Sequence, residues 1–257
     1  MDQLGLKSLN LVYGTHKMAS GLKYGVMCDA IDTATAYDNA DEIRNAIDRV
    51  TDHPPIIITK FNTKDFETGI DKAVEQHLSK LGRKPDVVLL HATFGDNNKN
   101  LDALVSLKTL FPTSIVGVSN FSVDEIKYLV ELGGLRPQVV QLEYHPFFQP
   151  NYLVQYCHEN DIVVMAYRPF GQGAILADPK IKSIAEKLCA TPAQIILKWL
   201  KNKDILPVFS SNSLTNIVTN CQYDNVSLRY LDTMELNGMN IGPNGSTCMT
   251  KYCNNVY

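Results

Sequence analysis

Residues 115–120 read Ile-Val-Gly-Val-Ser-Asn, a short apolar run that ends at Ser119 and Asn120. Six other apolar runs also end at a polar residue: 26–31 at Asp32, 56–59 at Lys60, 87–90 at His91, 139–140 at Gln141, 162–166 at Tyr167 and 205–209 at Ser210. Short, β-branched runs are typical of strands buried on both faces of a parallel sheet. With helical segments between them, they predict βα units that close into a (β/α)8 TIM barrel. The active site of such a barrel lies at the C-terminal ends of its strands, so these polar residues are functional candidates.

The length and composition agree with this fold. The chain has 257 residues, close to the roughly 250 typical of the barrel, so we expect one domain over residues 1–257. The net charge of -3, with both signs well mixed, offers no field for a polyanion, and nucleic acid is not an expected partner. No run approaches the roughly 18 apolar residues of a membrane helix, and no signal peptide pattern opens the chain. The sequence therefore predicts a cytoplasmic protein without a membrane partner.

The cysteines indicate no special chemistry. None of the six has CxxC spacing, so buried free thiols are the expected state. Cys248 and Cys253 are the only close pair, and the tail supplies no further ligands for a metal ion. We expect no metal site.

Periodicity and capping residues place the remaining elements. A first strand is expected at 9–13, and helices at 39–50, 65–81, 101–111, 123–132, 150–160, 179–188, 191–201 and 214–221. Thr191 followed by Pro192 predicts an N-cap with proline at the first helical position. Pro207 is unusual for a central strand. Residues from about 240 to 257 are rich in Gly, Asn, Thr and Ser and predict an irregular tail.

Four candidates from neighbouring strand ends suit one reaction: Asp32, Tyr37, Lys60 and His91. Adjacent strands lie about 4.8 Å apart, so these side chains can converge at the barrel mouth. An unperturbed tyrosine has a pKa near 10, too high for efficient proton donation at neutral pH. We expect the Lys60 ammonium to lower the pKa of Tyr37, and Asp32 to keep that lysine charged. His91 would orient a carbonyl oxygen or share in the proton relay.

Each of these residues also has a purely structural interpretation. Asp32 can cap the following helix or form an ion pair with Lys60, whereas His91 and Tyr37 can be packed core residues. For any one of them alone, the structural interpretation is favoured. Four mutually suited groups at one barrel mouth favour function.

Seven segments of the chain resemble the signature segments of aldo-keto reductases, in the family order and over roughly residues 10 to 235. They are Ile-Asp-Thr-Ala-Thr-Ala-Tyr at 31–37, Thr-Lys-Phe at 59–61, Leu-Leu-His at 89–91, Val-Gly-Val-Ser-Asn-Phe at 116–121, Gln-Leu-Glu-Tyr-His-Pro at 141–146, Ala-Tyr-Arg-Pro-Phe-Gly at 166–171 and Thr-Pro-Ala-Gln at 191–194. The resemblance implies NAD(P)H-dependent reduction of an aldehyde or ketone. It also implies a catalytic tetrad of Asp32, Tyr37, Lys60 and His91, with the tyrosine as general acid.

The resemblance further implies which residues bind the cofactor. Ser119, Asn120 and Gln141 match the residues that hold the nicotinamide carboxamide, and Tyr167 matches the residue on which the ring stacks. An amide needs donors and acceptors, and a flat ring needs an aromatic face, so these side chain types fit. Arg168 either contacts the pyrophosphate or is a surface charge. The other expected cofactor contacts are Gly14, Thr15, Asp32, Pro169, Phe170, Gly171, Ser210, Ser211, Asn216 and Asn220.

The chain departs from the family pattern in three places. About eight residues precede the first strand, so the N-terminal hairpin that plugs the barrel floor is expected to be shortened or absent, which would leave the floor more exposed. His16 replaces an aromatic residue, and Ala92-Thr93 replaces a Trp-Pro pair after His91. Phe61 and Phe94 are expected as replacement walls, with His16, of a more open or more polar substrate pocket.

The third departure concerns the cofactor. Members that prefer NADPH carry a Lys-Ser pair and a later Arg, where this chain has Ser210, Ser211 and Asn216. Hydroxyls and amides bind a phosphate more weakly than charged groups do. The family favours NADP(H), with NAD(H) as the alternative.

Two classes of function follow. The first is a monomeric carbonyl reductase that acts on a small aldehyde or ketone. The second is a weakly active or inactive module of the same fold that binds dinucleotide as a sensor, structural or partner-binding protein. The complete tetrad favours the reductase.

Overall fold

The computed structural model describes residues 3–17, 21–49, 53–131 and 133–248. Eight parallel strands form a closed barrel in which each strand pairs with the next in sequence and β8 pairs with β1. The strands are β1 (Val12–Gly14), β2 (Ala30–Asp32), β3 (Ile56–Phe61), β4 (Val87–Leu90), β5 (Ile115–Ser119), β6 (Val139–Glu143), β7 (Val163–Tyr167) and β8 (Ile205–Phe209). The predicted (β/α)8 barrel is confirmed, and Pro207 is accommodated inside β8.

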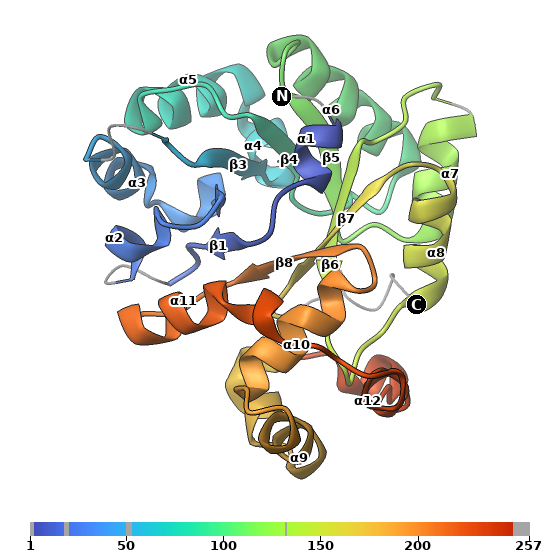
Figure 1. Cartoon of the computed structure of the whole chain (residues 1–257). Coiled ribbons are helices and arrows are strands. Elements are labelled where there is room, and N and C mark those ends of the chain that lie inside the picture. The colour runs from blue at the N-terminus through green and yellow to red at the C-terminus, as the bar shows by residue number, and fades with distance from the viewer. Residues whose placement is uncertain (1–2, 18–20, 50–52, 132, 249–257) are drawn as a thin grey trace.

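Helices surround the barrel (Figure 1). They are α1 (Gln3–Lys7), α2 (Leu22–Gly25), α3 (Ala40–Ile47), α4 (Thr63–Thr68), α5 (Ile70–Leu81), α6 (Asn97–Leu110), α7 (Val123–Glu131), α8 (Asn151–Glu159), α9 (Pro179–Lys187), α10 (Pro192–Lys201), α11 (Leu214–Cys221) and α12 (Tyr230–Asn237). Short 3-10 turns η1 (Thr35–Tyr37), η2 (Gly171–Ala177), η3 (Tyr223–Asn225) and η4 (Gly242–Gly245) complete the connections. No helix within the described ranges is long and apolar enough to cross a membrane.

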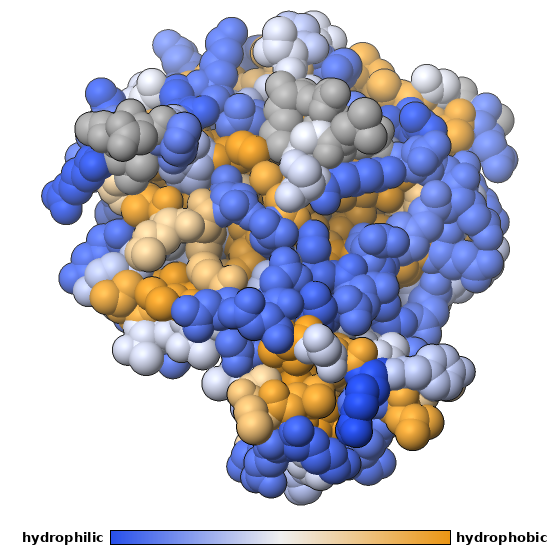
Figure 2. Space-filling model, viewed as in Figure 1, coloured by the Kyte–Doolittle hydropathy of each residue, from blue (hydrophilic) through white to orange (hydrophobic). Residues whose placement is uncertain are grey.

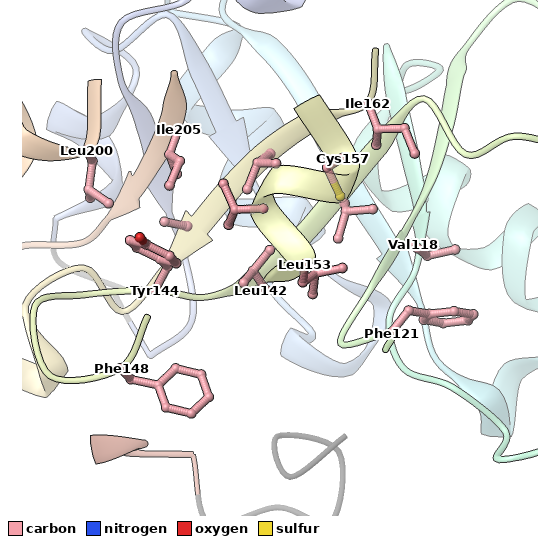
Figure 3. Packing of buried hydrophobic residues seen from close by; sticks show 14 of the residues in the cluster. Val118, Phe121, Leu142, Tyr144, Phe148, Leu153, Cys157, Ile162, Leu200 and Ile205 are labelled. Carbon is pink, nitrogen blue, oxygen red and sulfur yellow. The ribbon is translucent and has the colours of Figure 1, made fainter. Parts of the chain in front are cut away.

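Alternation along the strands produces two separate apolar layers. Side chains that point into the barrel, such as Ile58 and Leu89, pack on one another, and those that point outward pack against the helices. Figure 3 shows part of the outer layer, in which Leu142 of β6 lies next to Leu153 of α8, and Tyr144 lies on the side of Ile205. The buried Lys60 side chain follows Ile58 on the same face of β3, near the C-terminal end of this strand.

The barrel floor is closed in a way that the sequence did not predict. In the part of the chain that the structure describes, α1 precedes β1 and no hairpin is present. Leu6 and Leu9 are 0% and 7% exposed and join the inner apolar layer. The expectation of a more exposed floor is therefore wrong, because these two leucines fill it.

Capping residues fix the start of α10, the helix that packs on β8. Thr191 Oγ1 accepts a hydrogen bond from the Gln194 backbone N–H, and the Gln194 side chain accepts one from Thr191, as in a capping box. Pro192 occupies the first turn, as predicted. The apolar face of α10 then buries Trp199, whose ring stacks on Tyr144 with the centroids 5.5 Å apart.

Several predicted elements are wrong in detail. The single helix expected at 65–81 is divided into α4 and α5, because Gly69 has φ = 112°, a conformation that favours glycine and cannot continue a helix. Of the strand expected at 26–31, only its end belongs to β2, since α2 and a turn occupy the residues before it. Helices α1, α2 and α12 were not predicted.

The cysteines also differ from expectation. Cys28 and Cys157 are buried free thiols, as predicted, but Cys189 and Cys221 are exposed. Cys248 is disulfide-bonded, so the expectation of free thiols throughout is wrong. The tail beyond residue 248, which was predicted to be irregular, lies outside the described residues.

The surface is largely polar, with local apolar areas. Figure 2 shows apolar side chains at the surface near α11 and, at the lower end of the view, near α9 and α12. The exposed apolar residues of these helices include Leu214 and Val218 on α11, and Leu231 and Met234 on α12.

Candidate active site

The four predicted catalytic residues meet at the C-terminal end of the barrel. Asp32 is the last residue of β2, Lys60 lies near the end of β3, and His91 follows β4 directly. Tyr37 ends the turn η1, which leads from β2 toward α3. The parallel register of β2, β3 and β4 holds these strand ends side by side.

Lys60 and Asp32 form a buried ion pair. The lysine Nζ lies 2.5 Å from Asp32 Oδ1 and donates a second hydrogen bond to the Thr33 carbonyl oxygen at 2.9 Å. Gln141 Nε2 donates to the other carboxylate oxygen at 2.8 Å. Burial lowers the pKa of Lys60, and the charge of Asp32 opposes this shift. The two charges compensate each other where the Lys60 and Asp32 side chains are only 1% and 5% exposed.

The phenol of Tyr37 lies among three basic side chains. Its ring centroid lies 5.2 Å from Lys60 Nζ, 5.8 Å from the His91 ring and 4.9 Å from the His16 ring. Burial raises the pKa of Tyr37, the Asp32 charge raises it further, and Arg168 lowers it. The expectation that Lys60 lowers this pKa is wrong for this arrangement, because desolvation dominates and the lysine charge is compensated by Asp32.

His91 is a neutral imidazole at physiological pH. Burial lowers its pKa to about 3, and the charges of Lys60 and His16 act in the same direction. The backbone carbonyl of His91 accepts a hydrogen bond from Asn120 Nδ2 at 3.1 Å, which ties it to the end of β5. The N–H of a neutral imidazole can donate a hydrogen bond to the carbonyl oxygen of a substrate without bringing a positive charge to the site.

Three tetrad residues, Asp32, Tyr37 and His91, line a cavity of about 1200 Å³. This exceeds the 300 to 1,000 Å³ usual for pockets that bind drug-sized ligands, so a dinucleotide and a small substrate have room together. Most predicted cofactor and substrate residues line it: Gly14, His16, Asp32, Tyr37, His91, Ser119, Asn120, Gln141, Tyr167, Arg168, Pro169, Phe170, Ser210, Ser211, Asn216 and Asn220.

The residues predicted to hold the nicotinamide amide already bond to one another. Asn120 Oδ1 accepts a hydrogen bond from the Tyr167 hydroxyl at 2.7 Å, and Asn120 Nδ2 donates to Ser119 Oγ at 3.1 Å. Asn120 has φ = 62°, in the left-handed region, where asparagine is tolerated better than most residues. These bonds fix an aromatic face and a set of amide and hydroxyl groups on one wall, which suits a nicotinamide.

The cavity lining after β8 and on α11 has neutral side chains, Ser210, Ser211, Asn216 and Asn220. The two lining cations, Arg168 and Lys17, follow β7 and β1, the strands that pair with β8 on either side. Ser213 caps α11 by accepting a hydrogen bond from the Asn216 backbone N–H. The polar groups available to a ligand beside β8 and α11 are therefore side-chain hydroxyls and amides and the backbone N–H groups at the start of α11.

Five predicted site residues do not line the cavity. The expectation that Phe61 and Phe94 form its walls is wrong. Phe61 alternates with Lys60 along β3 and so points outward, where its ring lies 5.7 Å from that of Phe111. Phe94 packs on Phe66, with the centroids 5.9 Å apart. The other three are Lys60, which is 1% exposed, Thr15, whose hydroxyl donates to the Asp32 carbonyl oxygen, and Gly171.

The structure adds an anchor for the C-terminal segment that was not predicted. The Glu143 carboxylate, 1% exposed, accepts hydrogen bonds from Ser246 Oγ at 2.6 Å, the Thr247 N–H at 2.8 Å, the Thr247 hydroxyl and the Cys248 N–H at 3.2 Å. His145 Nε2 lies 3.2 Å away on the other side. These bonds, despite burial, lower the pKa of Glu143 to about 2. They hold residues 246–248 at the barrel mouth, where Cys248 lines the cavity.

Further lining residues carried no prediction. Lys17 lies at the mouth, and small or polar side chains continue the wall. They include Ala36, Asn62, Thr63, Ala92, Gln172, Gly173, Leu176, Thr191, Pro192, Ala193, Val208 and Thr219. Glu143 lies two residues after Gln141 in β6, so the two side chains point to the same side of the strand. This spacing could have marked Glu143 as a residue near the site.

Comparison with known proteins gives consistent matches. The model of the aldo/keto reductase family matches residues 15–239. An aldo-keto reductase of Mycolicibacterium vanbaalenii is 30% identical over 247 residues, which cover 93% of this chain and 88% of that protein. Aldo-keto reductase family 1 member A1 of Mus musculus is 26% identical, over 88% of this chain and 80% of that protein.

Solved structures agree with these matches. The crystal structure of MGS-M4, an aldo-keto reductase from a Medee basin deep-sea metagenome library, has a TM-score of 0.84 at 26% identity and covers 96% of this chain and 95% of that one. An aldo/keto reductase from Brucella melitensis has a TM-score of 0.80 at 29% identity, with 90% and 93% covered.

Proposed function

The chain belongs to the aldo-keto reductase family, whose members reduce carbonyl compounds with NAD(P)H, and we propose that in this member Tyr37 donates the proton to a small aldehyde or ketone. The observation that carries the proposal is that Tyr37 and His91 both line the large cavity, with the buried Lys60 Nζ 5.2 Å from the centroid of the Tyr37 ring. Ser119, Asn120 and Tyr167 supply the groups for the nicotinamide on the neighbouring wall. When bound there, the reduced nicotinamide supplies a hydride to the carbonyl carbon.

Each tetrad residue has a separate task. The substrate oxygen is placed between the Tyr37 hydroxyl and the neutral His91 ring, which orient it. Burial keeps the phenol protonated at neutral pH, so the proton is available for transfer. As the proton leaves, the Lys60 ammonium stabilises the phenolate that forms, and Asp32 holds that ammonium in place.

The choice of dinucleotide is the finer part of the proposal. The family favours NADP(H), and in the neutral lining beside β8 and α11, Ser210, Ser211 and the start of α11 would hold its 2'-phosphate. Without a charge-assisted bond there, we expect the Kd values of NADPH and NADH to differ by less than about tenfold. Fluorescence titration with both dinucleotides measures this ratio. We also propose that the protein is a monomer and acts in the cytoplasm. Light scattering after size-exclusion chromatography measures the molar mass and so tests the monomer.

The Tyr37→Phe variant tests the mechanism. It should lose at least about a hundredfold in kcat, because general acid catalysis contributes roughly 10² to 10⁴, and should bind both dinucleotides as the wild type does. A panel of small aldehydes and ketones is followed by the loss of NADPH or NADH absorbance. Full turnover by Tyr37→Phe would refute the assigned role. Dinucleotide binding by the wild type without oxidation on any panel member would favour the inactive module instead.

A further inference from the structure

The proton donor of the proposed mechanism lies on a very short turn. Tyr37 is the last residue of η1, a 3-10 turn of three residues, and Asp38 after it has φ = 47°, in the left-handed region. Turns of this kind have poorer hydrogen-bond geometry than an α-helix. The position of the phenol therefore depends on the contacts that hold residues 33–39 to the rest of the barrel.

Asn39 ties both ends of this segment to the ends of β1 and β2. Its Oδ1 accepts a hydrogen bond from Thr33 Oγ1 at 2.8 Å. Its Nδ2 donates to Thr15 Oγ1 at 2.9 Å and to the Thr15 carbonyl oxygen at 3.2 Å. The Thr15 hydroxyl donates in turn to the carbonyl oxygen of Asp32 at 3.0 Å, which completes a chain of bonds around the segment. Thr15 and Thr33 are 2% and 0% exposed, so these bonds are shielded from water.

Asn39 makes these bonds in place of another that its position allows. It is the N-cap of α3, where the side chain of an asparagine ordinarily accepts a hydrogen bond from an N–H of the first helical turn. Asn39 forms no such side-chain cap. Its amide therefore serves the segment that carries Tyr37 and not the start of the helix.

Asp65 holds the middle of the same segment. Its Oδ2 accepts a hydrogen bond from Thr35 Oγ1 at 2.6 Å and another from the Asn62 N–H at 2.8 Å. The second bond belongs to the capping box that starts α4, directly after β3. One carboxylate thus joins the turn that carries Tyr37 to the end of the strand that carries Lys60. Bonds to a charged acceptor are stronger than bonds between neutral groups.

We propose that Asn39 and Asp65 are positioning residues for the proton transfer, which hold Tyr37 where its hydroxyl meets the carbonyl oxygen of the substrate. The inference rests on the proposed function, since it concerns the same proton donor. Neither residue is part of the cavity lining, so each acts on the substrate only through the tyrosine. A misplacement of about 1 Å at a reacting group can lower a rate about a hundredfold.

Two substitutions that keep the size of the side chain test the proposal. Thr35→Val removes the hydroxyl that bonds to Asp65, and Asn39→Asp removes the N–H donors to Thr15. Each variant, with NADPH bound, is mixed with the panel aldehyde that the wild type reduces fastest, and NADPH oxidation is followed in a single turnover. The rate constant should fall about 10- to 100-fold in each variant, whereas KM and the Kd of NADPH should change less than about threefold.

Two matched variants separate the position of the donor from a general loss of structure. Thr35→Ser keeps the hydroxyl and should recover most of the rate that Thr35→Val loses. Thr68→Val removes a hydroxyl from the same region, where Thr68 Oγ1 donates to the Lys64 carbonyl oxygen at 2.9 Å on the exposed side of α4, and should react as the wild type does. Melting temperatures of all variants show separately whether the fold is disturbed.

The outcomes distinguish this inference from the proposed function. A single-turnover rate within threefold of the wild type in Thr35→Val or Asn39→Asp overturns the role given to Asp65 or Asn39, respectively, while the function of Tyr37 stands. A Thr35→Ser variant as slow as Thr35→Val, or losses confined to KM and NADPH binding, also overturns the inference. Full turnover by Tyr37→Phe, or a wild type that reduces no carbonyl of the panel, refutes the proposed function and the inference with it.

Discussion

Replacement of Asp32 by asparagine should lower the free energy of unfolding by about 3 to 5 kcal/mol, the usual cost of removing one partner from a buried ion pair. The side chains of Asp32 and Lys60 are 5% and 1% exposed, and the atoms that join them are 2.5 Å apart. Asparagine keeps the size of the side chain and one acceptor, but it leaves the Lys60 charge uncompensated away from water. In a chain of this size, we expect a fall in melting temperature of roughly 6 to 20 °C.

The same variant should have a distinctive pH dependence. Without its counter-ion, Lys60 should have a folded-state pKa still further below its ordinary value of 10.5. The folded state then binds fewer protons than the unfolded state, so the stability of Asp32→Asn should rise with pH up to about 10.5, more steeply than that of the wild type.

Urea denaturation of a double-mutant cycle measures these effects. Lys60→Met combined with Asp32→Asn removes both charges, so the double variant should be more stable than the sum of the single losses predicts. Asp38→Asn is the control, because Asp38 forms an exposed pair with Lys80 at 2.7 Å and its loss should have no measurable effect. An Asp32→Asn variant within 1 kcal/mol of the wild type, or additive losses in the cycle, would refute the reasoning.

Two further predictions concern buried titratable groups. Glu143→Gln should lower the unfolding free energy at neutral pH by about 3 kcal/mol, because a folded-state pKa of about 2 instead of 4.5 stabilises the fold above pH 4.5 and this contribution disappears as the pH falls toward 2. Backbone amides of residues 246–248 should also exchange hydrogen faster in this variant. Unchanged exchange there would contradict the role of Glu143 as an anchor. The pKa of His91 is about 3 in the folded state, so the unfolding free energy of the wild type should decrease from pH 6.5 toward pH 3 more than that of His91→Gln. Urea titrations at several pH values measure this, and an equal dependence of the unfolding free energy on pH in the two proteins would contradict it.

The sequence predicted the barrel and the strand ends well because both depend on local pattern. Continuous apolar runs and the polar residue after each one place Asp32, Lys60 and His91 without knowledge of the rest of the chain. The same alternation should have excluded Phe61, since neighbouring residues of a strand point to opposite sides. Gly69, whose φ of 112° divides the predicted helix, has a conformation that its flanking sequence does not reveal.

The hydrogen bonds that anchor the C-terminal segment to Glu143 could not be predicted from local sequence patterns. Its partners Ser246, Thr247 and Cys248 lie about a hundred residues further along the chain, in a segment whose composition predicts only an irregular tail. The pKa of Tyr37 was predicted with the wrong sign for a related reason. Burial depends on the whole fold, and here it outweighs the charge of the neighbouring lysine.

That reversed sign changes what the tetrad must accomplish. A lysine that lowered the pKa of the phenol would favour phenolate before the substrate arrived, whereas burial raises the pKa of Tyr37 and so keeps the phenol protonated at neutral pH. The electrostatic help of Lys60 is then needed only while the proton is in transfer, when negative charge develops on the tyrosine oxygen. The Lys60 Nζ lies 5.2 Å from the ring centroid and offsets part of this developing charge, an effect that its ion pair with Asp32 weakens without cancelling. Because Asp32 fixes the position of this cation, Asp32→Asn should impair kcat even with those substrates that it binds normally.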